Sequence, residues 1–404
     1  MTAETVVLAF SGGLDTSWCV PWLRETRGAR VVTVTVDVGG FDEAERARLA
    51  ARSAELGAVE HHHLDARERF FDEVLRHLIA GNVTRGHLYP LCVGAERGIQ
   101  ARLVAETARD IGAGAVVHGC TAAGNDQIRF EIALRALAPE LEIVAPIRDL
   151  APSREDEVRF LEERGFAVAK SSGRYSINSG LWGVSIGGVE TNGTTASIPE
   201  EAWVRTRGAF EDPRPPRRLR LGFTGGVPSR LDDRELAPVA LIEELDGIAA
   251  ALGIGRGIHL GDTILGAKGR VAFEAPAAAV ILTAHRELEK LVLSGPQQRV
   301  KDELAAQYGE FVHTGRALEG LCRDIEAFFG SSQRNVTGEV SLLLRPGSIF
   351  VEGVSSPHSI HAASRSVYGE AVGEWTPEDA RGFAAISALP SVLAARVAQG
   401  ESRS

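Results

Sequence analysis

A short stretch near the start of the chain has the residue types of a phosphate-binding loop. Residues 9–17 read Ala-Phe-Ser-Gly-Gly-Leu-Asp-Thr-Ser and begin at the end of an apolar run over 5–10. The glycines at 12–13 allow unusual backbone dihedral angles, so several N–H groups can converge on one anion. The residues after them suit the first turn of a helix, where unbonded N–H groups also face an anion. We therefore expect this loop to bind phosphate.

Other interpretations of the loop stay open from the residues alone. The spacing Ala9-x-Ser11-x-Gly13 is close to the G-x-S-x-G turn that exposes a nucleophilic serine. A glycine turn from strand to helix without a ligand is another. A Walker loop is excluded because its lysine is missing, and the similar stretch over 261–269 has Ala267 at that position. Several donors to a charged group, worth about 1.5–3 kcal/mol each, together with a bound metal ion, can in part replace that lysine.

The first 150 residues predict a parallel sheet that holds this loop at the end of its first strand. Apolar runs alternate with amphipathic stretches, a pattern typical of strands that alternate with helices. Ligands of such sheets bind beyond the carboxyl ends of the strands, where the loop lies. We expect strands over 6–10, 29–38, 58–64, 115–118 and 143–146, and helices over 42–55 and 99–111.

The pattern changes near residue 170, where we expect a second, α+β domain. Residues 171–193 are rich in serine, glycine and asparagine, and residues 253–269 are rich in glycine. A helix-start pattern, Thr-Pro-Glu-Asp, begins at Thr376 and predicts a terminal helical arm over 376–399.

Composition excludes several classes of partner. The 404 residues, 44% hydrophobic and 24% charged, are typical of a globular protein too long for one core. A formal net charge of −10 argues against general binding to nucleic acid or membrane surfaces. The four cysteines lack metal-binding spacing, so we expect reduced thiols in a cytoplasmic protein. No secretion signal or membrane span is expected, because no apolar run is long enough.

Three consecutive histidines at 61–63 suggest a metal site at first sight. On a strand their side chains alternate in direction, so all three cannot reach one ion. We expect histidines at a strand end and assign no metal ligand.

The loop also carries a family resemblance. S-G-G-x-D-[ST] after a first strand is the signature of the PP-loop ATP pyrophosphatases, which cleave ATP between the α and β phosphates, and residues 11–16 match it. The longer stretch AFSGGLDTS resembles the argininosuccinate synthase family. Residues 118–131, HGCTAAGNDQIRFE, are similar to the family's HG-x-T-x-x-GNDQ-x-RFE. Residues 175–185 and 273–276 resemble its YS-x-(D/N) and E-x-P segments, and the resemblance continues in order to about residue 395.

The resemblance implies a fold and a reaction. The fold is α/β, with a nucleotide-binding PP-loop domain (adenine-nucleotide hydrolase-like) over 1–168, an α+β synthetase domain over 169–370 and a C-terminal oligomerisation arm over 371–404. In the reaction, ATP, citrulline and aspartate give argininosuccinate, AMP and pyrophosphate through a citrullyl-adenylate, in arginine biosynthesis. Mg²⁺-ATP is the implied co-substrate and a cytoplasmic homotetramer the implied assembly, without nucleic acid or membrane.

The resemblance also assigns residues to each substrate. Asp126, near the reacting ammonium, is the implied catalytic residue, although an Asn-Asp-x-x-Arg run by itself is more often a solvated helix start. The implied ATP-binding residues are Ala9, Phe10, Ser11, Gly12, Gly13, Leu14, Asp15, Thr16, Ser17, Val36 and Gly119. Those for aspartate are Thr121, Asn125 and Asp126, and those for citrulline are Tyr89, Asn125, Arg129, Ser176, Ser185 and Glu274.

The chain departs from the commonest family pattern at the amino-acid site. Val93 stands where a threonine is expected at aspartate, Gly94 where a serine is expected at citrulline, and Thr283 where a tyrosine is expected. We predict that neighbouring residues supply the missing contacts. Two alternatives stay open: a PP-loop, AMP-forming ligase that joins a different ureido-type acid and amine, and a non-catalytic nucleotide-binding paralogue.

Overall fold

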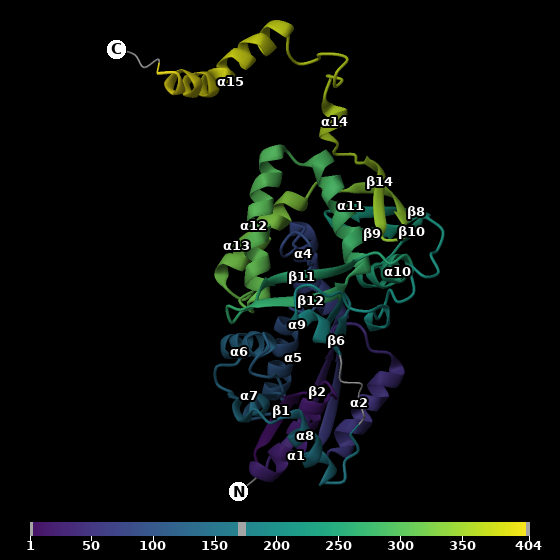
Figure 1. The fold of residues 1–404 in the computed structure, drawn as a ribbon, viewed down its shortest axis with the longest axis vertical. Coiled ribbons are helices and arrows are strands. Elements are labelled where there is room, and N and C mark those ends of the chain that lie inside the picture. The colour runs from purple at the N-terminus through teal and green to yellow at the C-terminus, as the bar shows by residue number, and fades with distance from the viewer. Residues whose placement is uncertain (1–2, 169–174, 401–404) are drawn as a thin grey trace. The chain divides into compact units, whose positions relative to one another are not determined.

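The structure, a computed structural model, describes residues 3–168 and 175–400. It divides into two compact units, residues 1–356 and residues 357–404. Unit 1 contains both a parallel sheet and two antiparallel sheets (Figure 1). The mixed α/β class predicted from the sequence is confirmed.

Five parallel strands form the first sheet of unit 1, in the order β3-β2-β1-β4-β5. Each predicted strand is present, with ends within two residues of the expected ones. Their bounds are β1 (Thr5–Ala9), β2 (Arg30–Asp37), β3 (Glu60–Asp65), β4 (Ala115–His118) and β5 (Glu142–Val144). The order reverses at β1, which pairs with β2 on one side and β4 on the other.

Helices cover both faces of this sheet. Alternate residues of a strand point to opposite faces, so neighbouring residues of β1 pack in different apolar clusters. Val6 and Leu8 pack in one apolar cluster with residues of α1 (Leu14–Thr26), whereas Val7 packs in another with residues of α5 (Glu96–Asp110). Two helices of this part were predicted from the sequence, α2 (Glu43–Glu55) and α5. The other helices of this part are α3 (Arg67–Phe70), a π-helix (Phe71–Leu75), α4 (Arg76–Gly81), α6 (Asp126–Leu137), α7 (Pro146–Leu150) and α8 (Arg154–Glu162).

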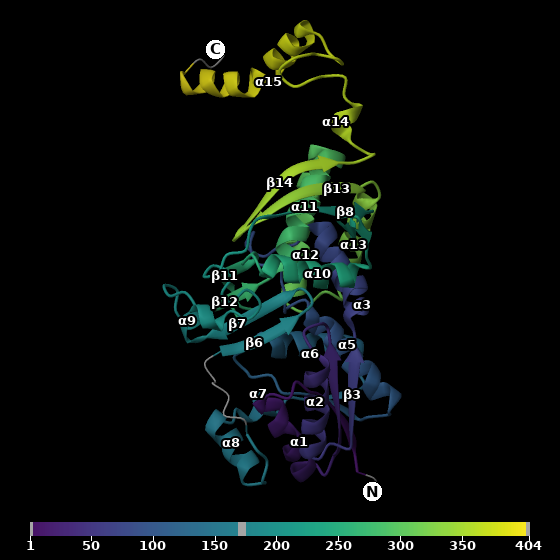
Figure 2. The same cartoon turned by 90° about the vertical axis from the view of Figure 1, so that its right-hand side faces the viewer.

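The second part of unit 1, from residue 175 to residue 356, contains two antiparallel sheets and several helices. In two perpendicular views the four-stranded sheet lies between the parallel sheet and helices α11 to α13 (Figures 1 and 2). Its order is β11-β12-β7-β6, with β6 (Tyr175–Gly180), β7 (Gly183–Gly188), β11 (Arg256–Asp262) and β12 (Lys268–Glu274). The five-stranded sheet has the order β10-β9-β8-β13-β14, with β8 (Arg217–Thr224), β9 (Val227–Leu231), β10 (Arg234–Glu235), β13 (Gly338–Arg345) and β14 (Ser348–Ser355).

The helices of this second part share a core with the first. One buried cluster includes residues of β2, α5, α11 and β13, and the Asn82 side chain after α4 donates to Glu289 of α11 at 2.6 Å. The bounds are α9 (Val189–Asn192), a 3-10 helix (Glu200–Ala202), α10 (Pro238–Ala250), α11 (Pro276–Val292), α12 (Gly295–His313) and α13 (Gly320–Gln333). The proposed boundary between residues 168 and 169 therefore separates two types of sheet within one compact unit.

Unit 2 contains the short α14 (Ile360–Ala363) and the long α15 (Pro377–Ala398). Thr376 caps α15 as predicted: its hydroxyl accepts from the Asp379 N–H, and the Asp379 carboxylate accepts from the Thr376 N–H at 2.9 Å. All the residues of α15 are at least partly exposed. Within the residues that the structure describes, no helix combines the length and the apolar character needed to cross a membrane.

Candidate active site

A pocket of about 990 Å³ lies at the carboxyl ends of β1, β2 and β4, where the strand order reverses. This is the place where open parallel sheets bind ligands. Its volume is at the upper end of the roughly 300–1,000 Å³ usual for ligand sites, so it can hold more than one small molecule. Residues of the antiparallel β6–β7 and β11–β12 hairpins also line it.

The loop over 9–17, which the sequence predicts to bind phosphate, forms one wall of the pocket. Of the residues predicted to bind ATP, the lining includes Ala9, Phe10, Ser11, Gly13, Asp15, Thr16, Val36 and Gly119. Gly12, Leu14 and Ser17 are not among the lining residues. Gly12 has a positive φ of 69°, and a Cβ atom there would lie 2.4 Å from Leu49 Cδ2. A side chain at position 12 would therefore strain the backbone and collide with Leu49.

The geometry at Ser11 does not support a serine nucleophile. Ser11 Oγ lies 3.1 Å from Thr16 Oγ1 and accepts from the Gly13 N–H at 3.4 Å. Across residues 3–168 and 175–400, no imidazole is hydrogen-bonded to Ser11, so the base that such a nucleophile needs is not in place.

Two carboxyl groups meet at the start of α1, beside the loop. Burial raises the pKa of Asp15. It also raises the pKa of its hydrogen-bonded neighbour Glu157 to about 8, and the Asp15 charge adds to that shift. Glu157 Oε2 is buried without a hydrogen-bond partner. A carboxyl pair that disfavours its own negative charge, with an unused oxygen, fits a bound divalent cation.

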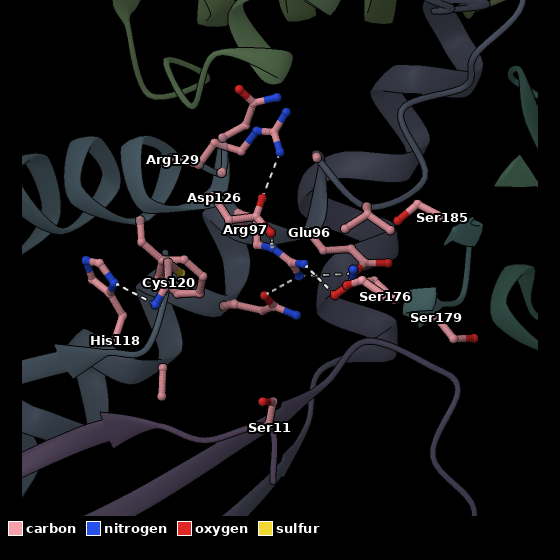
Figure 3. A pocket seen from close by; sticks show the side chains of 18 of the residues that line it. Ser11, Glu96, Arg97, His118, Cys120, Asp126, Arg129, Ser176, Ser179 and Ser185 are labelled. Carbon is pink, nitrogen blue, oxygen red and sulfur yellow. Dashed lines mark hydrogen bonds and ion pairs between the residues drawn. The ribbon is translucent and has the colours of Figure 1, made fainter. Parts of the chain in front are cut away.

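The residues predicted to bind aspartate line the pocket, but Asp126 is already paired (Figure 3). Its carboxylate lies 3.0 Å from Arg97 Nε and 2.7 Å from Arg129 Nη1. Burial acts to raise the pKa of Asp126, but the two guanidinium groups outweigh it and hold this pKa below its usual range. Asp126 is thus a stable carboxylate whose charge is neutralised by the protein.

The start of α6 is not a solvated helix end. Asn125 Oδ1 accepts from the Ile264 N–H at 2.9 Å, which ties this helix to the β11–β12 turn. Gln127 and Arg129 are buried. The Asn-Asp-x-x-Arg run therefore belongs to the pocket wall, as the resemblance implied.

The pocket wall beside Arg129 explains part of the unusual Tyr89–Gly94 stretch. A Cβ atom at Gly94 would lie 3.3 Å from the Arg129 guanidinium carbon, so glycine leaves that group room. Val93 lines the pocket too. Tyr89 is buried and stacks on His259, with ring centroids 5.6 Å apart.

Ser176 and Ser185 reach the pocket from β6 and β7 (Figure 3). Glu274 and Thr283 are not among the lining residues. The Glu274 carboxylate accepts from the backbone N–H groups of residues 204–206, at 2.7–3.2 Å, and from the Thr206 hydroxyl at 2.6 Å. The predicted citrulline contact at Glu274 would require these bonds to be exchanged. The Thr283 hydroxyl donates within its own helix, to the Ala279 carbonyl at 2.7 Å.

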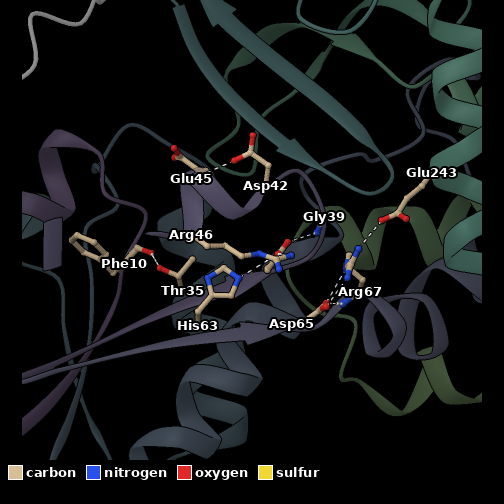
Figure 4. A network of polar contacts seen from close by, with 11 residues as sticks. Phe10, Thr35, Gly39, Asp42, Glu45, Arg46, His63, Asp65, Arg67 and Glu243 are labelled. Atoms are coloured by element: carbon tan, nitrogen blue, oxygen red, sulfur yellow. Dashed lines mark hydrogen bonds and ion pairs between the residues drawn. The ribbon is translucent and has the colours of Figure 1, made fainter. Parts of the chain in front are cut away.

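A polar network supports the end of the pocket at β2 (Figure 4). The Thr35 hydroxyl donates to the Phe10 carbonyl at 2.7 Å and so fixes the start of the loop. The buried Asp37 carboxylate lies 2.8 Å from Arg46 Nη2 and 3.3 Å from His63 Nε2. His61, in contrast, contacts Thr33. His61 and His63 lie on the same side of β3, since side chains alternate along a strand, but they contact different residues of β2.

Sequence reasoning missed several residues of the pocket. They are Glu96, Arg97, Asn178, His259 and His313. Arg97 Nη2 donates to Asn178 Oδ1 at 3.2 Å, which joins α5 to β6. Glu96 and Arg97 lie just after the unusual residues Val93 and Gly94, so this charged pair was a usable signal. His259 and His313 come from distant segments and carried no such signal.

Comparison with known proteins finds two family models that together match most of the chain. Residues 5–167 match the model of the arginosuccinate synthase N-terminal HUP domain, and residues 175–394 match that of the arginosuccinate synthase C-terminal domain. A protein named argininosuccinate synthase from Xanthomonas campestris pv. campestris is 39% identical over 98% of this chain and 100% of its own length. One of the same name from Methanocaldococcus jannaschii is 39% identical over 88% and 89%, and one from Pyrobaculum aerophilum is 37% identical over 98% and 99%.

Proposed function

The chain belongs to the argininosuccinate synthase family, and on that premise we propose that its pocket joins citrulline to aspartate with the cleavage of ATP to AMP and pyrophosphate. One observation carries the proposal. Most of the loop over 9–17 and, except for Glu274, the residues expected to bind both amino acids line a single cavity, although they come from different elements, among them β1, α6, β6 and β7. A carbonyl oxygen and an α-phosphate can thus be held next to each other, which is the main requirement of this reaction.

We assign the loop over 9–17 to the β and γ phosphates. Backbone N–H groups at the start of α1, with the hydroxyl groups of Ser11 and Thr16, face the departing pyrophosphate. The citrulline ureido oxygen then attacks the α-phosphate, and the aspartate amine displaces AMP from the resulting adenylate. Positioning and charge stabilisation supply most of the catalysis in such phosphoryl chemistry.

Each amino acid has a separate set of residues in this proposal. Thr121, Asn125 and Asp126 follow β4 in the chain, line the pocket and would bind aspartate. Arg129, Tyr89, Ser176 and Ser185 would bind citrulline, because guanidinium and hydroxyl donors suit its carboxylate and ureido oxygens.

Asp15 and Glu157 are the residues that fit Mg²⁺ near the loop, by their oxygen donors and the unpartnered Glu157 Oε2. The ion would neutralise phosphate charge when bound with ATP. The residues of the chain hold the phosphates and orient the acceptor.

We further propose a cytoplasmic homotetramer. The four cysteines are free thiols, which suits a reducing compartment. In α15 the side chains of Phe383, Ile386, Leu393 and Val397 are 74%, 70%, 54% and 72% exposed in the single chain. Their spacing places them along one helix face, and an apolar face of this kind requires a partner.

The direct test is incubation with Mg²⁺-ATP, citrulline and aspartate. We expect AMP and pyrophosphate in equal amounts and argininosuccinate by mass spectrometry. Release of ADP would contradict the proposal. A ligase for another acid and amine would show pyrophosphate exchange only with other members of a ureido-acid panel, and a non-catalytic paralogue would bind ATP without any acceptor-dependent exchange.

A further inference from the structure

Glu96 is a buried carboxyl group of the pocket wall, and one of its oxygens makes no hydrogen bond to the residues that the structure describes. It is the first residue of α5, is 1% exposed and lines the pocket. In the part of the chain that the structure describes, Oε1 makes no hydrogen bond, and Oε2 lies 3.6 Å from Arg97 Nη1. Burying a carboxyl oxygen without a donor is unfavourable, so such a group requires a functional or structural reason.

The surrounding structure makes room for this carboxyl group at Gly180. A Cβ atom at Gly180, the last residue of β6, would lie 1.8 Å from Glu96 Oε1. Any other residue at that position would displace the carboxyl group. Glu96 is therefore held at a defined place, on the same wall as Arg97 (Figure 3).

Charged groups from several elements act on Glu96. Burial raises its pKa to about 8, and the Asp126 charge on α6 acts in the same direction. Arg97 on α5 and Arg205 after the 3-10 helix act to lower this pKa. Tyr89 and Cys92, from the segment before α5, are neutral because burial raises the pKa of both.

The amine substrate needs an anionic partner that is free to accept a hydrogen bond. Asp126 fits this need less well, because each of its oxygens already faces a guanidinium group, at 3.0 Å from Arg97 Nε and 2.7 Å from Arg129 Nη1. Glu96 lies on the same wall and has an unused oxygen. A carboxyl group that titrates near neutral pH also matches what a general base requires.

We propose that Glu96 binds the ammonium group of the amine substrate and takes the proton that its nitrogen must lose before it attacks. The inference rests on the proposed function. The ammonium N–H bond breaks and Glu96 becomes the neutral acid. The nitrogen lone pair forms the C–N bond, and the C–O bond to AMP breaks with its electron pair on the AMP oxygen. The departing phosphate accepts the second proton of the nitrogen, and Glu96 returns its proton to solvent.

The test separates the two half-reactions in the wild type and in Glu96→Gln, which is isosteric. Citrulline-dependent exchange of pyrophosphate into ATP without aspartate reports the first half, and aspartate-dependent formation of AMP reports the second. We expect the exchange to stay within about twofold and kcat/KM for aspartate to fall about 100-fold, the lower end for loss of a general base. In the wild type, kcat/KM for aspartate should rise with pH as Glu96 loses its proton. This rise should disappear in Glu96→Gln.

Two further variants control for effects on folding. Glu96→Asp keeps the acid and should recover part of the aspartate-dependent rate and its pH dependence. Glu326→Gln removes a buried carboxyl group outside the pocket, where Glu326 accepts from the Tyr308 hydroxyl at 2.8 Å, and should change neither half-reaction. Wild-type exchange together with an unchanged aspartate-dependent rate and pH profile in Glu96→Gln would overturn the role of Glu96 alone. Absence of exchange in the wild type would overturn the proposed function and this inference with it.

Discussion

Arg129 on α6 is bonded twice to His313, the last residue of α12. Its Nε donates to the His313 carbonyl oxygen at 2.7 Å, and its Nη2 lies 3.1 Å from His313 Nδ1. The guanidinium group thus satisfies a terminal carbonyl of α12 and lies at the negative end of that helix dipole. The same side chain contacts Asp126, so one group links the pocket wall at α6 to α12.

The buried His313 ring makes stability depend on pH. Burial, and then the Arg129 charge, lower its pKa from 6.5 to about 3. Because the folded pKa lies below the unfolded one, the unfolded state takes up the proton first as the pH falls. The stability present above pH 6.5 is therefore lost progressively below it, by about 2 kcal/mol at pH 5. Urea unfolding of the wild type and of His313→Gln at pH 7.5 and 5.0 measures this difference. An equal pH dependence in both proteins would contradict the prediction.

Gly12→Ala should damage the phosphate-binding loop more than a matched glycine change elsewhere. Gly28 also has a positive φ, of 59°, but the space around it is open, whereas a Cβ at Gly12 would collide with Leu49. Both variants should lose about 1 kcal/mol of stability to backbone strain. Only Gly12→Ala should also raise KM for ATP, by about tenfold, because the loop must shift. Similar KM values for the two variants would show that the loop tolerates a side chain there.

Glu274→Gln distinguishes a structural carboxylate from a substrate contact. The carboxylate accepts four N–H or O–H donors from residues 204–206. An amide places an N–H against some of these donors, so we expect a loss of about 3 kcal/mol in the free energy of unfolding. Chemical denaturation and the KM for citrulline are both measured. A tenfold rise in KM with unchanged stability would instead support the citrulline contact predicted from the sequence.

Charges on the apolar face of α15 should dissociate the proposed tetramer. Ile386→Glu with Leu393→Glu places two carboxylates on that face, whereas Ala388→Glu with Ala395→Glu places them on the opposite one. We expect light scattering to give the mass of a smaller species for the first pair and of the tetramer for the second. A wild-type protein that is monomeric at all concentrations would contradict the tetramer itself.

The sequence predicted the parallel sheet well because its signals are local. Each strand is an apolar run of a few residues, and the order of strands and helices restricts the topology to a few choices. The loop over 9–17 was located for the same reason, since a glycine pair at the end of a strand is a local pattern.

The charge pairing inside the pocket was not predictable in this way. Asp126 was expected near the substrate ammonium group, but its pairing with Arg97, which comes from a different helix, was not expected. Glu274 was expected in the pocket, but it bonds to backbone N–H groups some 70 residues earlier in the chain. Both outcomes depend on which distant segments pack together, and side-chain types alone do not contain that information.

The close approach of Gly180 and Glu96 also restricts the order in which these two positions can change. While a glutamate occupies position 96, a side chain at position 180 collides with it. A lineage that gains a side chain at position 180 must therefore displace the carboxyl group of residue 96 or shorten that residue. Of the two orders of change, only the one in which residue 96 is shortened first avoids an intermediate protein with a displaced carboxyl group in the pocket wall.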